Sequence, residues 1–267
     1  MNKRHHLVLA VAAASLVLTG CGSKEDAKKP SGDKTTVAAS SGTDLTKANF
    51  ISTVTAAQQK AKTSHVTMDM SAASQKINAT GDVEVGATVA DTKVSMKMDL
   101  GSLGGGSMEM RLVDKTFYIN MGAISNNKFA KLDLTDKSNP LTAQYGGLLD
   151  QLDPSKQLEQ LKGAVRSVEK KGAAITLDGV KAQPYEMTVD TTKLKDLKGA
   201  GAQVPDTITY TMFIGPDNLP RRFTFDLMGS KATMDYSKWG ESVDIKQPAK
   251  DQITDSSFLD QLGKAPA

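Results

Sequence analysis

The sequence has few of the side chains on which most catalytic and metal sites depend. It contains one cysteine, Cys21, and three histidines, two of them at residues 5 and 6. A lone cysteine excludes an internal disulfide framework. Because His65 is the only other histidine, a His-based metal cluster, a Ser-His-Asp relay and a Cys-His pair all lack their parts. We therefore expect no enzyme, no metal and no cofactor, and a fold held by an ordinary apolar core.

Charge of one sign is also lacking. The formal net charge is +3, and it falls to +1 if Lys3 and Arg4 are removed with the N-terminal segment. A nearly balanced chain offers no electrostatic surface for nucleic acid. The glycine run "GSLGGGS" at residues 101–107 lacks the Lys-Ser/Thr ending of a phosphate-binding loop. Three scattered basic pairs are interpreted as solvated surface: Lys28-Lys29, Lys170-Lys171 and Arg221-Arg222.

The N-terminal segment carries an apolar stretch that is too short for a membrane span. Residues 7–18 would rise only about 18 Å as a helix, against roughly 30 Å for the hydrocarbon core. The basic start "MNKRHH" and this stretch indicate a secretion signal. The stretch ends in "LTGC", which resembles a bacterial lipobox. We predict a signal peptide at residues 1–20, lipidation of Cys21, and a chain anchored by lipid to the extracytoplasmic side of the cell membrane.

Beyond Cys21 the composition divides the chain in two. Residues 22–43 are small and polar with one valine, so they cannot bury enough apolar area to offset ordering. We therefore predict the lipidated cysteine and a flexible tether at residues 21–43. No second linker follows, so residues 44–267 are expected to form a single lipid-binding β-sheet domain.

Strand periodicity dominates this domain. Val66, Met68 and Met70 alternate with Thr67 and Asp69, which places the apolar side chains on one face. Comparable alternation recurs at residues 93–100, 108–112, 207–214, 222–227 and 233–236. Helices are predicted at residues 44–62, where Asp44 can cap, and as a broken pair over 141–164, with Leu158, Leu161 and Val165 on one side of its second helix. A short helical turn is predicted near residues 191–199, and a last helix at 255–263. The pattern predicts an α+β fold with a large curved antiparallel sheet of about ten strands and few helices.

The apolar face of the predicted sheet is rich in methionine and poor in aromatic residues, which make up only 5% of the chain. Two interpretations stay open. Methionine fills gaps in packed cores, but it also adapts to varied apolar surfaces and specifies a core poorly. With few helices to cover the sheet, an apolar hollow could remain for a ligand. The candidate cavity residues are Val66, Met68, Met70, Val94, Met96, Met98, Met108, Met110, Leu112, Tyr210, Met212, Phe223, Phe225 and Met234.

The C-terminal run "LPRRFTFDL…ATMDYSKWGESVDIKQP", from Leu219 to Pro248, resembles the end of the LppX/LprA/LprF/LprG-type lipoproteins of actinobacteria. Lipobox, polar tether, first helix and long alternating strands follow the same order. The resemblance implies a half-open barrel similar to the LolA/LolB carriers, with helices on its concave face. It also implies binding or transfer of diacyl or triacyl lipids or lipoglycans in the cell envelope, with an envelope transporter as a partner. Trp239-Gly240 is interpreted as a structural turn.

A second function from another class stays open. If the sheet is fully packed, the chain would be a non-enzymatic protein-interaction or envelope-sensing lipoprotein that recruits a partner through its polar face or an edge strand.

Overall fold

The structure of the protein is a computed structural model that describes residues 44–72, 75–86, 91–101, 106–136, 162–194, 205–227 and 230–254. The predicted signal peptide, Cys21 and the tether lie outside the described residues. The predicted helix at 255–263 and most of the predicted helical pair at 141–164 also lie outside them.

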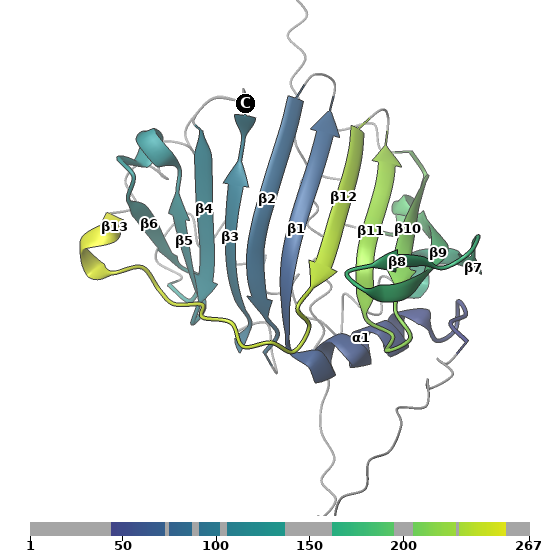
Figure 1. Ribbon diagram of the computed structural model, residues 1–267. Coiled ribbons are helices and arrows are strands. Elements are labelled where there is room, and N and C mark those ends of the chain that lie inside the picture. The colour runs from purple at the N-terminus through teal and green to yellow at the C-terminus, as the bar shows by residue number, and fades with distance from the viewer. Residues whose placement is uncertain are drawn as a thin grey trace, which may run out of the picture.

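The described residues contain helix α1, three 3-10 turns, thirteen strands and a helical segment at residues 162–164 directly before β7 (Figure 1). In chain order they are α1 (Phe50–Ala61), β1 (Thr63–Ala72), β2 (Gln75–Glu84), β3 (Lys93–Asp99), β4 (Ser107–Val113), β5 (Thr116–Asn120), η3 (Gly122–Ser125), β6 (Phe129–Asp133), β7 (Val165–Lys170), β8 (Ile175–Leu177), β9 (Val180–Asp190), η4 (Thr191–Lys193), β10 (Thr207–Ile214), β11 (Pro220–Leu227), β12 (Ser230–Ser237), η6 (Lys250–Gln252) and β13 (Ile253–Thr254).

The strands form one curved, open sheet in the order β13-β6-β5-β4-β3-β2-β1-β12-β11-β10-β9-β7, with β8 paired to β9 (Figure 1). All pairings are antiparallel except that of β13 with β6. From the centre of the sheet, strands β1 to β6 follow one another in chain order toward one edge. Strands β12, β11, β10, β9 and β7 follow one another toward the other edge. The pairing of β1 with β12 joins these two series. The expected fold class is therefore confirmed, with thirteen strands instead of about ten.

Helix α1 begins six residues later than the sequence pattern suggests. Asp44 is not its cap; instead Asn49 precedes the first helical residue and its side-chain oxygen accepts a hydrogen bond from the Thr46 backbone N–H, at 2.7 Å. The helix buries Phe50, Ile51 and Val54, a spacing that places all three on one side. In Figure 1, α1 lies at the lower ends of β11 and β10.

Tight turns fix the register of several hairpins. Asp114 and Lys115 both have positive φ, 49° and 62°, and connect the paired residues Val113 and Thr116. Two consecutive positive φ values match the two-residue turn whose twist suits a hairpin.

One prediction for the start of β7 was wrong. Val165 was expected on a helix face, but it begins β7 and pairs with β9.

The last described residues form a C-terminal strap, defined as residues 238–254, which runs from β12 past the ends of β1 to β5 and reaches β13 at the opposite edge (Figure 1). Its start is the expected Trp239-Gly240 turn, in which the Trp239 indole N–H donates to the Pro220 carbonyl at 2.9 Å. The Arg111 guanidinium donates to the Lys246 carbonyl at 3.1 Å. The Tyr118 hydroxyl donates to the side-chain carbonyl of Gln247 at 3.1 Å.

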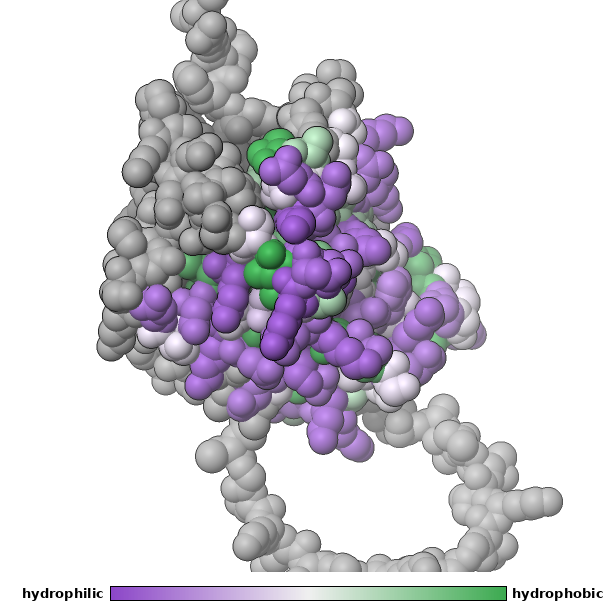
Figure 2. Space-filling model, turned by 90° about the vertical axis from the view of Figure 1, so that its left-hand side faces the viewer, coloured by the Kyte–Doolittle hydropathy of each residue, from purple (hydrophilic) through white to green (hydrophobic). Residues whose placement is uncertain are grey.

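Figure 2 shows the molecule from the edge that carries β13 and β6, where hydrophilic residues predominate among the coloured atoms and hydrophobic residues stand in small separate groups. Charged side chains at an edge discourage pairing with another chain's strand. Some apolar residues of this region pack beneath the strap, where Val113, Tyr118, Phe129 and Ile245 form a buried cluster. Others, Ala130, Leu132 and Leu134, form a separate buried cluster with Leu112.

Candidate functional site

Strand register brings all fourteen candidate cavity residues to the same face of the sheet. Directly paired residues point to the same side, so the pairs Met96 with Met110 and Met98 with Met108 link β3 to β4 on that face. The face continues through β2 and β1 to β12, where Met68 lies opposite Met234. We call this side the apolar face and the other the polar face.

Helix α1 covers one part of the apolar face. Phe50 and Val54 pack with Met187, Met212 and other residues of β7, β9 and β10 in a core whose members are almost completely shielded from solvent. Met187 is 0% exposed and Met212 is 3% exposed. Met212 is therefore a core residue of this cluster, and it lies apart from the more exposed candidates.

The remaining methionine candidates are half-buried. We define the methionine surface by these seven residues: Met68, Met70, Met96, Met98, Met108, Met110 and Met234. Val66 and Leu112, at 5% and 6% exposure, are the buried candidates beside it. Helix α1 packs on the β9–β10 side of the apolar face, and Ala164, the last of the helical residues 162–164 before β7, belongs to the same core. The seven methionines thus differ in environment from Met187.

Small residues lie among these methionines. Ala79 pairs with Met98, and Gly81 pairs with Met96. A Cβ atom on Gly81 would overlap the Ser95 carbonyl oxygen, so the close approach of β2 and β3 requires glycine at this position. Because neither residue projects a large side chain, the flexible thioethers opposite them have room to change rotamer.

Aromatic candidates stand between the methionine surface and the α1 core. The rings of Tyr210 and Phe223 have centroids 4.9 Å apart, and those of Phe223 and Phe225 lie 5.8 Å apart. Burial raises the pKa of the Tyr210 phenol well above its ordinary value. The neutral phenol therefore persists across the physiological range, and this row presents uncharged rings to the apolar face.

The polar face carries a hydrogen-bond series that sequence reasoning missed. His65 Nδ1 lies 2.8 Å from Asp82 Oδ1, and His65 Nε2 lies 3.2 Å from Thr80 Oγ1. The arrangement of Asp82, His65 and Thr80 resembles a catalytic triad, but β1 and β2 are both interior strands of the sheet. Their backbone N–H groups are used in the ladders, so none is free to stabilise an oxyanion here. The series acts as a cross-strand polar network, detectable only once the register is known.

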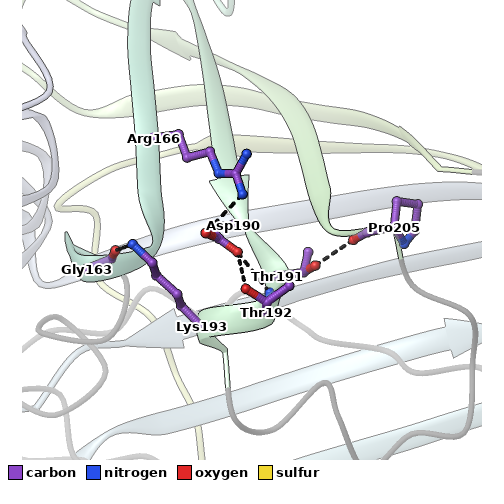
Figure 3. Close-up of polar contacts among 7 residues, drawn as sticks. All are labelled: Gly163, Arg166, Asp190, Thr191, Thr192, Lys193 and Pro205. Carbon is purple, nitrogen blue, oxygen red and sulfur yellow. Dashed lines mark hydrogen bonds and ion pairs between the residues drawn. The ribbon is translucent and has the colours of Figure 1, made fainter.

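A second polar cluster closes one end of β7, β9 and β10 (Figure 3). Asp190 accepts hydrogen bonds from the Thr192 hydroxyl at 2.5 Å and from the Arg166 guanidinium at 3.1 Å. The Thr192 hydroxyl and then Arg166 lower the pKa of the Asp190 carboxyl. Figure 3 also shows Thr191 donating to the Pro205 carbonyl, which ties η4 to the start of β10. These contacts hold the ends of β7, β9 and β10 together, so the cluster has a structural role.

The described residues contain neither a cluster of metal-ligating side chains nor a membrane-spanning helix. No group of three or more His, Cys, Asp or Glu side chains there could hold a metal ion. Within the same ranges, no helix is long and apolar enough to cross a membrane.

Comparison with known proteins bears on the fold. No family model matches the chain, and no curated protein matches it. The lipoprotein LppX of Mycobacterium tuberculosis aligns with a TM-score of 0.52 at 14% identity, over 75% of this chain and 98% of that one. The chain has the fold of LppX. LprF of Mycobacterium bovis aligns with a TM-score of 0.49 at 14% identity, over 76% of this chain and 96% of that one.

A DUF1329 family protein from Desulfovibrio piger aligns with a TM-score of 0.31 at 11% identity, over 76% of this chain and 96% of that one. The LppX alignment, with its TM-score above 0.5, confirms the expected architecture at the level of fold. Cys21, the residue expected to carry the anchor, lies outside the described residues, and contact of the fourteen candidates with lipid stays a prediction.

Proposed function

We propose that this protein is a membrane-anchored lipoprotein that binds acylated lipids against the methionine surface and carries or transfers them in the cell envelope. The half-buried state of the seven methionines is the observation on which the proposal rests. Met187, on the same face beneath α1, is fully buried. Apolar surface left partly exposed over several adjacent strands is typical of a ligand-binding surface.

The chemistry of this surface suits fatty chains of varied shape. Thioether side chains adapt to irregular apolar partners, and the small residues Ala79 and Gly81 leave space between them. Each methylene removed from water contributes about 0.8 kcal/mol. Ten shielded methylenes would thus contribute about 8 kcal/mol, the range of a micromolar complex before association costs are subtracted. Lipids with two or three acyl chains would bind more firmly than a single fatty acid.

The N-terminal sequence supports the proposed location. An acylated Cys21 would anchor the chain, and the polar tether at residues 22–43 would let the sheet domain reach lipids away from its own anchor. Under this proposal the protein moves lipid without making or breaking bonds, and a transporter in the envelope is the expected donor or acceptor.

Mass spectrometry of lipids extracted from the purified protein tests the binding step. We expect diacyl or triacyl species in stoichiometric amount. Met96→Glu should abolish their retention because it places a carboxylate on the apolar face. Ser95→Glu is the matched control, since it adds the same charge to the neighbouring residue on the polar face of β3.

A vesicle assay tests the transfer step. Labelled diacyl lipid should move from donor to acceptor vesicles faster with wild-type protein and with Ser95→Glu than with Met96→Glu. If no lipid is extracted and both variants behave alike, the lipid proposal is wrong and the interaction or sensing function is favoured. Cys21→Ser should separately release the chain from the membrane fraction.

A further inference from the structure

A hollow lies beside the N-terminal end of α1, on the far side of the α1 core from the methionine surface. It has a volume of about 180 Å³ and is lined by residues of β7, β9 and the β10–β11 turn, with Leu45 and Ile214 as apolar walls. We call it the lysine pocket. At roughly 30 Å³ per water molecule, it has room for a small anion and the first atoms of a substituent.

Two cations stand at this pocket without partners. Lys170 pairs across the ladder with Tyr185, and Lys181 points to the same face of β9 as Tyr185. Among the described residues, neither lysine side chain forms a hydrogen bond or ion pair. The neighbouring Lys171 differs, because it lies 2.8 Å from Glu169 and 3.3 Å from Glu186. The charge of Lys170 and Lys181 is therefore available to a ligand.

Neutral donors line the same space. The Tyr185 side chain is 93% shielded, since only 7% is exposed, and its hydroxyl has no hydrogen-bond partner within the described residues. Burial, and then the charge of Asp44, raise the pKa of this phenol, so it stays a donor at neutral pH. The side-chain amide of Asn218 lines the pocket from the β10–β11 turn. Lys170 comes from β7, Lys181 and Tyr185 come from β9, and Asn218 comes from the β10–β11 turn, so the groups approach from three segments.

A buried cation lies behind the pocket. Arg221 is 7% exposed and donates through Nη2 to Asp217 at 2.6 Å, whereas its Nη1 has no partner. A Cβ atom on Gly215, which lines the pocket, would stand 3.5 Å from the Arg221 guanidinium carbon. A buried charge that is incompletely paired is costly. The negative charge of an anion in the lysine pocket would reduce the free-energy cost of burying the Arg221 guanidinium.

We infer that the lysine pocket binds a phosphate group. Lysines act as point charges toward phosphate, and a tetrahedral anion can accept bonds from donors on several sides at once. Lys170 and Lys181 supply the charge, while Tyr185 and Asn218 orient the oxygens. Asp44 is the one carboxylate in the lining, and it opposes binding. The site is separate from the methionine surface, so it stands whether or not that surface carries lipid.

Titration calorimetry of the full chain in neutral detergent tests this site with inorganic phosphate and with dihexanoyl phosphatidic acid. Lys170→Gln with Lys181→Gln should weaken phosphate binding at least tenfold, and Asp44→Asn should strengthen it several-fold. The matched control is Lys97→Gln with Lys131→Gln, which removes the same charge from exposed positions on the polar face and should change affinity less than twofold. Tyr185→Phe, a milder variant, should weaken binding several-fold without altering charge.

The two probes distinguish the sources of the phosphate. Tighter binding of the phosphatidic acid, lost in the double lysine variant, identifies a lipid head group. Equal affinity for both probes identifies a free phosphate. Absence of phosphate binding, or equal binding by the double lysine variant and its control, overturns the inference. Met96→Glu should leave phosphate binding unchanged, so failure of the lipid proposal and failure of this site give different results.

Discussion

Replacement of single methionines by tryptophan should separate packed core from ligand-binding surface. Met212 is 3% exposed beneath α1, and Met98 is half-buried opposite Ala79. An indole at Met212 has no space, so Met212→Trp should lower the free energy of unfolding by about 1–3 kcal/mol, the usual cost of overpacking. Met98→Trp should cost close to nothing, because the side chain at this position is only half-buried and lies opposite the small residue Ala79.

The assay has two readouts on the same preparations. Urea denaturation of delipidated protein, followed by far-ultraviolet circular dichroism, measures stability without ligand. Lipid extraction measures occupancy. Met98→Trp should retain less than a tenth of the wild-type lipid, whereas Met212→Trp should still bind lipid once folded. Bound lipid at a hundred times its Kd adds about 2.7 kcal/mol, so loaded wild-type protein should gain stability that Met98→Trp does not gain.

Equal destabilisation by the two variants would refute this reasoning, because it would mean that Met98 is packed as tightly as Met212. Normal lipid retention by Met98→Trp would likewise remove the methionine surface from the binding site.

Three further outcomes follow from the described contacts. Gly81→Ala should destabilise by about 2 kcal/mol or more because its Cβ would meet the Ser95 carbonyl, whereas Gly163→Ala, where the space is open, should be neutral in urea melts. Tyr118→Phe should cost about 1 kcal/mol and increase hydrogen exchange in the strap, since it removes the bond to a strap side chain. The lowered pKa of Asp190 contributes stability that is present above about pH 4 and lost as pH falls through the folded pKa; Asp190→Asn should therefore be less stable at pH 7 and show a flatter acid melt.

The strands were predictable because their periodicity is local. Val66, Met68 and Met70 alternate with polar residues, and this pattern alone assigns them to one face, as the register confirms. The start of α1 was less predictable. Asp44 is a good cap by residue type, but the Asn49 side chain bonds the Thr46 N–H and moves the first helical turn to Phe50.

Features that join distant segments could not be predicted from pattern. The strap pairs with β6 through only two residues and makes a few apolar contacts, so its sequence shows no periodic pattern of apolar residues. The His65 network requires the register of β1 with β2. Lys170 was assigned to a solvated basic pair, yet it lines a pocket with Lys181 because β7 and β9 pair. Its neighbour Lys171 forms the ion pairs with Glu169 and Glu186. The turn residues Asp178 and Gly179 were a usable signal for the β8–β9 hairpin.

The pairing of β1 with β12 leaves the middle of the sheet incomplete until late in synthesis. His65 lies opposite Ser237, so the ladder waits for more than half of the chain to emerge before it can close. Long-range pairing of this kind slows folding. A chain shortened before residue 230 would expose an unpaired edge on β1 and on β11 together. Such a fragment should aggregate, and a nascent chain kept extended until its C-terminal segment is available would avoid that outcome.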